Sequence, residues 1–295
     1  DGILYGPYIQ VHMIKIEGSF VAVATPYRGG KVDLPAVRDL VDFHLRSGTN
    51  GICPVATTGE SPVLSTEEKA EVIRTVVKMA RGKMIIAPGT GSNNTAGSIE
   101  MTKMAKDLRA DAALLVTPYY NKPTQEGLYR HFSAIAKAAP LPQILYNVPS
   151  RTGVHMTPET IARLFRKKEV VAVKEASGSL DQISEIRNLC EIAILSGEDS
   201  LTYPILALGG KGVISVAANI IPKQIAQMCA AALKGDFRKA QKIHLAHYHL
   251  FKTLFVETNP IPVKTALKMM GYIEAEFRLP LTPMTPKGIT TLRRV

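Results

Sequence analysis

The sequence lacks tryptophan and holds only three cysteines, Cys53, Cys190 and Cys229, among its 295 residues. The cysteines are odd in number, lie far apart and form no CxxC pair, so they indicate neither a disulfide framework nor a zinc site. No apolar run reaches the roughly 18 residues that a membrane-spanning helix needs. We therefore predict a cytoplasmic protein without a membrane partner.

Acidic residues are also scarce relative to basic ones, because 36 Lys and Arg against 25 Asp and Glu leave a net charge of +11. The basic residues are scattered, and their densest cluster, 163–168, lies at an expected helix end, where cations suit the helix dipole. No RNA- or DNA-binding signature accompanies them. We expect no nucleic-acid partner and interpret the charge as a field that attracts small anionic substrates.

Short β-branched runs alternate with longer helical patterns along most of the chain. Strands are expected at 21–25, 51–55, 84–87, 112–117, 143–147, 170–174, 193–196 and 212–216. Helices are expected at 34–47, 65–80, 95–109, 125–139, 157–165, 180–189 and 202–208, the second opening at a Ser65–Glu68 capping box.

Eight strand–helix units predict an α/β fold, a (β/α)8 TIM barrel with additional C-terminal helices, since parallel strands need helical crossovers and eight of them close. A doubly wound open sheet is the second choice, and the absence of GxGxxG after the first strand weighs against it. We interpret residues 1–12 as a leader or extension, 13–220 as the barrel, and 221–295 as the last barrel helix with a C-terminal helical region.

A single lysine, Lys174, follows the apolar run 170–173, which indicates a buried parallel strand with the lysine at its C-terminal end. An ammonium beside so much apolar surface is poorly solvated, which favours the neutral amine. Only the neutral amine attacks a ketone carbonyl, as a Schiff-base lysine must. The alternatives are a lysine that extends into solvent and one that pairs with Glu175.

The other strand ends of a barrel share the rim on which its chemistry occurs. Tyr146, on the neighbouring strand, could carry protons for an imine or only fill the rim. Thr57 and Thr58 could hold a carboxylate and pass protons, or only form a turn. Arg151 matches a carboxylate, or is an ordinary surface arginine. No His, Cys or carboxylate cluster lies among these residues, so we expect no metal and no cofactor.

Longer strings surround these positions. They are TTGES at 57–61, VTPYYN at 116–121, ILYNVPSRTG at 144–153, VKEA at 173–176, GVISV at 212–216 and NPIPVK at 259–264. In this order they resemble the dihydrodipicolinate synthase (4-hydroxy-tetrahydrodipicolinate synthase) family from Phe20 to about Pro286. The resemblance implies a lyase that condenses pyruvate with L-aspartate-4-semialdehyde to 4-hydroxy-tetrahydrodipicolinate, in the diaminopimelate branch of lysine biosynthesis.

The resemblance also assigns catalytic roles. Lys174 would form the imine with pyruvate, and Tyr146 would move protons to and from it. Thr57 would link Tyr146 to Tyr120 in a relay. In the family that second phenol comes from a partner subunit, so the resemblance implies self-association, at least a dimer and usually a dimer of dimers.

Substrate-binding roles follow in the same way. Thr58 and the backbone at Ile214 would hold pyruvate, and Arg151 would hold the carboxylate of the semialdehyde. Gly197 would be a further substrate-binding residue. N-acetylneuraminate lyase and the keto-sugar acid aldolases use the same lysine and tyrosine but generally lack this arginine, so they remain the closest alternative. A non-catalytic basic barrel that binds nucleic acid is the alternative from another class.

Two positions depart from the family pattern. Ala56 stands where a glycine is usual, which narrows the turn before Thr57 without removing a hydroxyl. Family members that lysine inhibits commonly carry a histidine and a glutamate where this chain has Lys69 and Gly97. A cation in place of histidine and a missing carboxylate disfavour a cationic ligand, so we expect lysine to inhibit weakly or not at all.

Overall fold

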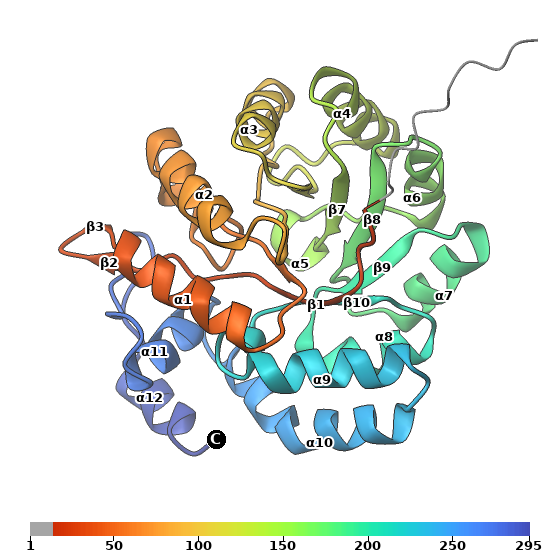
Figure 1. Cartoon of the computed structure of the whole chain (residues 1–295). Coiled ribbons are helices and arrows are strands. Elements are labelled where there is room, and N and C mark those ends of the chain that lie inside the picture. Colours follow the sequence, from red (N-terminus) through yellow and green to blue (C-terminus); the bar gives the residue numbers. More distant parts are fainter. Residues whose placement is uncertain (1–13) are drawn as a thin grey trace, which may run out of the picture.

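The structure is a computed structural model that describes residues 14–295. The segment 1–12, interpreted as a leader or extension, lies outside the described residues. Eight parallel strands form the centre, and helices ring them (Figure 1). The strands are β1 (Gly18–Val21), β4 (Gly51–Ile52), β5 (Ile85–Ile86), β6 (Ala113–Val116), β7 (Gln143–Asn147), β8 (Val170–Glu175), β9 (Ala193–Ser196) and β10 (Gly212–Ser215).

The sheet order β5-β4-β1-β10-β9-β8-β7-β6 leaves β5 and β6 at its two ends. A parallel bridge between Gly89 and Leu114 joins those ends. There the Leu114 amide donates to the Pro88 carbonyl at 2.9 Å, and the Thr90 amide donates to the Leu114 carbonyl at 3.0 Å. The predicted (β/α)8 barrel is therefore confirmed, and the doubly wound open sheet is wrong.

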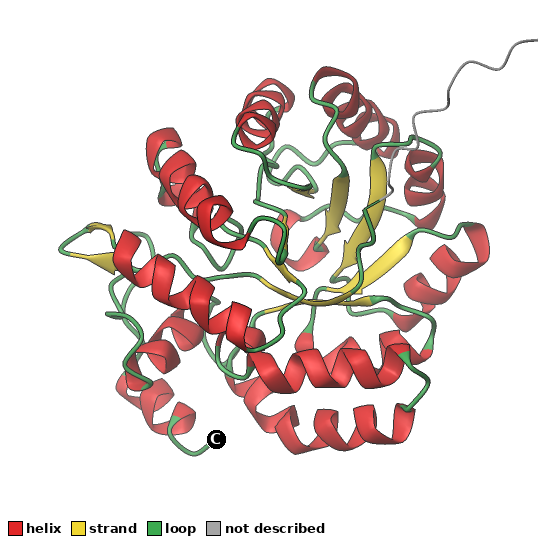
Figure 2. Ribbon diagram, in the orientation of Figure 1, coloured by secondary structure: helices red, strands yellow, loops and turns green. Residues whose placement is uncertain are grey.

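Eight helices follow the strands, as the amphipathic patterns predict (Figure 2). They are α1 (Leu34–Arg46), α2 (Thr66–Ala80), α3 (Thr95–Asp107), α4 (Gln125–Ala138), α6 (Pro158–Phe165), α7 (Leu180–Leu189), α8 (Thr202–Ala207) and α9 (Pro222–Leu233). The capping box at α2 is present, since Glu68 N donates to Ser65 Oγ at 3.2 Å and Ser65 N donates to Glu68 Oε2 at 3.0 Å.

Apolar side chains form two layers of core. Inside the barrel, Phe20, Ile144, Leu195 and Ile214 are fully buried. A larger cluster fills the space between the strands and the helix ring. Both faces of the strands are thus buried, which explains why the strand runs are continuously apolar and do not alternate.

The first strand lies earlier than the expected 21–25. Residues 22–25 leave the sheet because the Asn219 side chain takes the place of a neighbouring strand: its Nδ2 donates to Ala22 O at 3.0 Å and its Oδ1 accepts from Ala24 N at 3.1 Å. Three further strands or α-helices were not expected. They are β2 (Tyr27–Arg28) and β3 (Lys31–Val32), which form a hairpin, and the one-turn helix α5 (Pro149–Thr152).

Three additional helices follow α9: α10 (Phe237–Thr253), α11 (Ile261–Met269) and α12 (Pro286–Leu292). The segment after α11 returns to the barrel. Glu276 accepts from the amides of Gly29 and Gly30 at 2.9 and 3.0 Å, and Arg278 pairs with Glu68 of α2 at 2.6 Å. The C-terminal helices are therefore tied to the first two strand–helix units.

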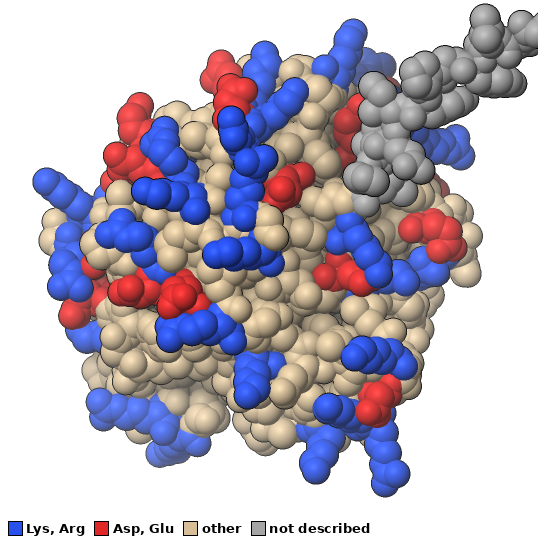
Figure 3. Space-filling model, viewed as in Figure 1, with Lys and Arg blue, Asp and Glu red and all other residues tan. Residues whose placement is uncertain are grey.

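Surface charge is dispersed. Lysine and arginine side chains are spread over the face in Figure 3, with aspartate and glutamate among them. Within residues 14–295, none of the helices combines the length and the hydrophobicity that crossing a membrane would need.

Candidate active site

Lys174 and Tyr146 lie side by side in the barrel because β7 and β8 pair in parallel with these two residues in register. Lys174 is only 4% exposed, so the alternative of a lysine extending into solvent is wrong. Its Nζ sits 4.0 Å from the centre of the Tyr146 ring. A buried amine and a phenol in contact form a nucleophile with a proton carrier beside it.

The alternative in which Lys174 pairs with Glu175 is also wrong. Successive residues of a strand point to opposite faces, so Glu175 faces the helix ring. Its carboxylate accepts from Ser177 N at 2.7 Å, Asn147 Nδ2 at 3.0 Å and Gln182 Nε2 at 3.3 Å. Glu175 thus fastens β7, β8 and α7 behind the lysine.

Cys53 is the other potential nucleophile near the lysine. It is fully buried in the barrel, and burial raises the pKa of its thiol to about 12, against a smaller opposing effect of Lys174. A thiol with such a pKa stays protonated at neutral pH and is a weak nucleophile. Lys174 is therefore the nucleophile that this part of the barrel offers.

The loop after β4 carries Thr57 and Thr58. Thr58 is 1% exposed, and its Oγ1 accepts from Asn259 Nδ2 at 3.0 Å. The next residue is fixed as well, since Thr25 Oγ1 donates to Gly59 O at 2.8 Å. The loop is thus held by hydrogen bonds from an N-terminal residue, Thr25, and a C-terminal residue, Asn259.

Glu60 ends this loop in the left-handed conformation, with φ at 54°. Its side chain is buried and forms a 2.5 Å ion pair with Lys264 of α11, which is 0% exposed. Lys264 Nζ also donates to Glu276 O at 2.6 Å and lies 4.2 Å from the centre of the Tyr27 ring. Burial lowers the pKa of Lys264, while Glu60 opposes that shift. The pair fixes an uncommon backbone conformation next to the threonines.

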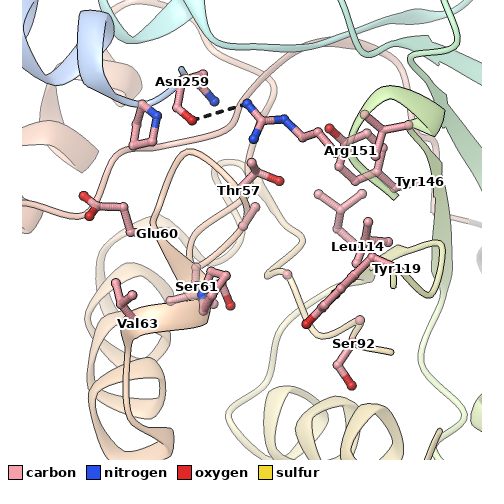
Figure 4. A pocket seen from close by; sticks show the side chains of 18 of the residues that line it. Thr57, Glu60, Ser61, Val63, Ser92, Leu114, Tyr119, Tyr146, Arg151 and Asn259 are labelled. Atoms are coloured by element: carbon pink, nitrogen blue, oxygen red, sulfur yellow. Dashed lines mark hydrogen bonds between the residues drawn. The ribbon is translucent and has the colours of Figure 1, made fainter. Parts of the chain in front are cut away.

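A cavity of about 370 Å³ opens beside this loop (Figure 4). Thr57, Tyr146 and Arg151 line it, and Figure 4 shows the three side chains reaching it from different segments. Arg151 stands on α5, and its Nη2 donates to Asn259 O at 3.3 Å. The guanidinium therefore has donors left for a substrate carboxylate.

A second cavity, of about 490 Å³, adjoins the first, because Tyr146, Val148, Arg151 and Thr258 line both. Gly197 lies in the wall of this second cavity. A Cβ at Gly197 would come within 2.5 Å of Ala176 Cβ, so the loop after β9 passes this close to β8 only with glycine.

Lys174, Thr58 and Ile214 line neither cavity and lie buried at 4%, 1% and 0% exposure. Ile214 is fixed through its neighbour Ser215, whose Oγ donates to Asp199 Oδ1 at 2.5 Å. Burial raises the pKa of Asp199, and the hydrogen bond from Ser215 opposes that shift. The loops after β9 and β10 are thereby joined.

Tyr120 lies apart from the other candidates. Its side chain is 89% exposed, it lines neither cavity, and its φ is 71°. Its neighbour Tyr119 reaches the first cavity instead. Within one chain, the structure brings together seven of the eight predicted site residues around the barrel mouth and leaves Tyr120 on the surface.

The matching family model is the dihydrodipicolinate synthetase family, which matches residues 15–295. The chain belongs to this family. A 4-hydroxy-tetrahydrodipicolinate synthase of Geobacter metallireducens is 52% identical over 270 residues, which are 91% of this chain and 93% of the relative.

Solved structures of the dihydrodipicolinate synthetase family agree. The dihydrodipicolinate synthase of Aquifex aeolicus is 48% identical, with a TM-score of 0.93 over 95% of this chain and 96% of that one. A monomeric dihydrodipicolinate synthase variant is 42% identical, also with a TM-score of 0.93, over 94% of this chain and 95% of that one.

Sequence reasoning missed three residues of this site: Glu60, Asn259 and Lys264. Two of them stand in the NPIPVK string, which carried the resemblance without being given a role. A lysine inside the apolar stretch of α11 was the available signal, because a buried cation requires a partner.

Proposed function

We propose that this protein condenses pyruvate with L-aspartate-4-semialdehyde through a Schiff base on Lys174, giving 4-hydroxy-tetrahydrodipicolinate for lysine and diaminopimelate biosynthesis. The observation that carries the proposal is the buried Lys174 amine, 4.0 Å from the Tyr146 ring, beneath two cavities that share Arg151. Membership of the family and the 52% identical synthase supply the reaction class.

The chemistry begins with attack of the neutral Lys174 amine on the keto carbon of pyruvate, and loss of water leaves an imine. The imine acidifies the adjacent methyl group, and Tyr146 takes the proton. The resulting enamine attacks the aldehyde carbon of the second substrate. The amine of that substrate then displaces Lys174 as the ring closes, which frees the enzyme.

Substrate binding is divided between the two sides of the site. We assign the carboxylate of pyruvate to Thr58, Gly197 and the backbone at Ile214; Thr58 and Ile214 are buried, as Lys174 is. We assign the carboxylate of the semialdehyde to Arg151, whose guanidinium lines both cavities. A planar fork of donors suits a carboxylate better than a point charge does.

Thr57 and Tyr120 complete a proposed proton relay from Tyr146. The exposure of Tyr120 supports a relay that forms only when a second copy presents this phenol, and a relative described as a monomeric variant implies that multimers are usual. We propose a dimer as the minimal active unit, assembled as a dimer of dimers. Three free cysteines in the described part of the chain suit a cytoplasmic location.

Pyruvate consumption by the purified protein tests the proposal, measured with and without aspartate-4-semialdehyde and with N-acetylneuraminate cleavage as the control reaction. We expect consumption only with the semialdehyde, and borohydride reduction in the presence of pyruvate should attach its carbons to Lys174. A Lys174→Met variant should lose both signals. Cleavage of the sugar acid without semialdehyde turnover would instead favour a sugar-acid lyase.

Arg151→Ala separates the synthase from the related sugar-acid enzymes. We expect the variant to lose semialdehyde turnover by roughly 10²-fold, since an arginine–carboxylate contact is a strong charge-assisted pair. Trapping of pyruvate on Lys174 should persist. An unchanged condensation rate would contradict the role of Arg151 and the synthase assignment with it.

A further inference from the structure

We infer that Asn259 is a positioning residue that orients the Thr58 hydroxyl of the pyruvate subsite from a place between the two substrate subsites. Its side chain holds the hydroxyl of Thr58, and its main chain holds the guanidinium of Arg151. The inference rests on the proposed function, because it concerns the groups assigned there to pyruvate and to the semialdehyde.

The contact with Thr58 has a direction. Asn259 Nδ2 donates to Thr58 Oγ1 at 3.0 Å, so the hydroxyl oxygen acts as acceptor and its own hydrogen remains free. Thr58 is 1% exposed, and within residues 14–295 its hydroxyl donates no hydrogen bond. A buried donor without a partner is unfavourable, and a substrate carboxylate satisfies it. Asn259 thus directs the Thr58 hydroxyl to serve as a donor.

The contact with Arg151 uses another part of the same residue. Arg151 Nη2 donates to the Asn259 carbonyl oxygen at 3.3 Å, as the dashed line in Figure 4 shows. A change of the Asn259 side chain leaves this carbonyl in place. One residue therefore contacts both subsites, and a mutation of its side chain removes the contact with Thr58 while the contact with Arg151 remains.

The segment that carries Asn259 is anchored independently of it. Five residues on, Lys264 forms the buried ion pair with Glu60, the residue that ends the Thr58 loop. Asn259 itself is 5% exposed and lines the first cavity. The loop therefore keeps its place when the side chain is shortened, and the loss is confined to the orientation of one hydroxyl.

Borohydride trapping of pyruvate on Lys174, followed by mass spectrometry across a pyruvate titration, tests the inference with Asn259→Ala and Asn259→Asp. For the alanine variant we expect half-maximal trapping at about tenfold higher pyruvate, the effect of one lost hydrogen bond. The KM for the semialdehyde should stay unchanged. The aspartate variant should bind pyruvate worse still, because its carboxylate accepts the Thr58 hydrogen and lies beside the anionic substrate.

Asn188→Ala and Asn188→Asp provide the matched control. They are the same two substitutions, made at an asparagine on the exposed face of α7. In a Thr58→Val background, Asn259→Ala should have no further effect on trapping, because the residue acts through that hydroxyl.

Three results would overturn the inference. The first is pyruvate trapping at the wild-type concentration by both Asn259 variants. The second is a parallel change in half-maximal pyruvate and in the semialdehyde KM, together with a lower melting temperature. The third is an effect of Asn259→Ala on trapping that adds in full to that of Thr58→Val. A wild-type protein that forms no pyruvate adduct overturns the proposed function together with the inference. A wild-type adduct with unaffected variants overturns the inference alone.

Discussion

The loops that follow β4 and β6 both carry a residue of the proposed proton relay, yet they are built in opposite ways. The β4 loop, with Thr57, is held by a buried ion pair and by hydrogen bonds from Thr25 and Asn259. The β6 loop leaves Tyr120 89% exposed, in a left-handed backbone conformation.

The difference separates what one chain completes from what it leaves open. Around Lys174 the groups assigned to pyruvate are fixed by contacts within the chain. The phenol of Tyr120 has no such contacts among the described residues, and in the relay proposed above a second copy positions it. The β4 loop is therefore fixed within the chain, whereas the Tyr120 side chain of the β6 loop is exposed to solvent.

Breaking the ion pair behind the β4 loop should have the largest effect. Lys264→Met leaves the Glu60 carboxylate buried without its cation, which destabilises a protein by about 3–5 kcal/mol. Denaturant unfolding followed by circular dichroism measures the loss. The double variant Glu60→Gln/Lys264→Met should recover most of it, since no charge is left unpaired; equal losses in the single and the double variant would contradict this account.

Removing the Tyr120 hydroxyl should affect activity and leave stability unchanged. We expect Tyr120→Phe to lower kcat by about 10²-fold, the usual size of an acid–base contribution, with the melting temperature of the wild type.

Mixing tests whether the phenol acts across subunits. Tyr120→Phe keeps Lys174, and Lys174→Met keeps Tyr120, so mixed dimers contain one complete site. Activity should return after the two inactive variants are mixed and allowed to exchange subunits. Persistent inactivity of verified mixed dimers would show that Tyr120 acts, if at all, within its own chain.

Acid should weaken the contact between α4, which follows the β6 loop, and the first residue of α3 through His131. The ring Nδ1 lies 2.9 Å from Thr95 Oγ1, and burial lowers the pKa of His131 to about 4. Neutral His131 makes its full contribution to stability above the histidine pKa of the unfolded chain, about 6.5. That contribution is lost as the pH falls toward 4, because the unfolded chain then binds the proton more readily.

We expect this group to account for about 2 kcal/mol of the stability lost between pH 7.5 and pH 5. The measurement is unfolding free energy at both values for the wild type and for His131→Leu, which should show a shallower dependence. His44, whose pKa burial lowers to about 3, weakens both proteins alike. Identical pH dependences would remove His131 from the explanation.

The smallest effect on activity is expected from added lysine. Its candidate site lies where the two loops meet, since the first cavity is lined by Ser61, Lys69 and Tyr119. Lys69 is half-buried there, and burial lowers its pKa. A lysine ligand would bring its ammonium near this amine, so millimolar lysine should inhibit weakly or not at all.

The double variant Lys69→His/Gly97→Glu provides the matching gain. A Cβ at Gly97 would meet nothing closer than Ser92 Oγ at 3.7 Å, so the first carbon of a glutamate side chain fits there. We expect lysine to inhibit this variant more strongly than the wild type. Half-inhibition of the wild type at sub-millimolar lysine would contradict the prediction.

Local patterns were sufficient for much of the site. Strand periodicity and the order of the units placed Lys174 and Tyr146 on adjacent strand ends, and the register of β7 and β8 agrees. These positions depend on short-range periodicity, which a sequence displays directly. The one-turn helix that carries Arg151 went unpredicted because four residues are too few to show a period.

The sequence by itself determined the barrel and the lysine at the end of its sixth strand, because apolar runs and helical spacing are properties of neighbouring residues. Only the tertiary structure decided how the β4 loop is held, since Asn259 and Lys264 reach it across 201 and 204 residues. It also decided that Tyr120 faces solvent while Tyr119 turns into the cavity. Contacts between distant segments, and the side of a loop that a residue takes, depend on packing that no local pattern records.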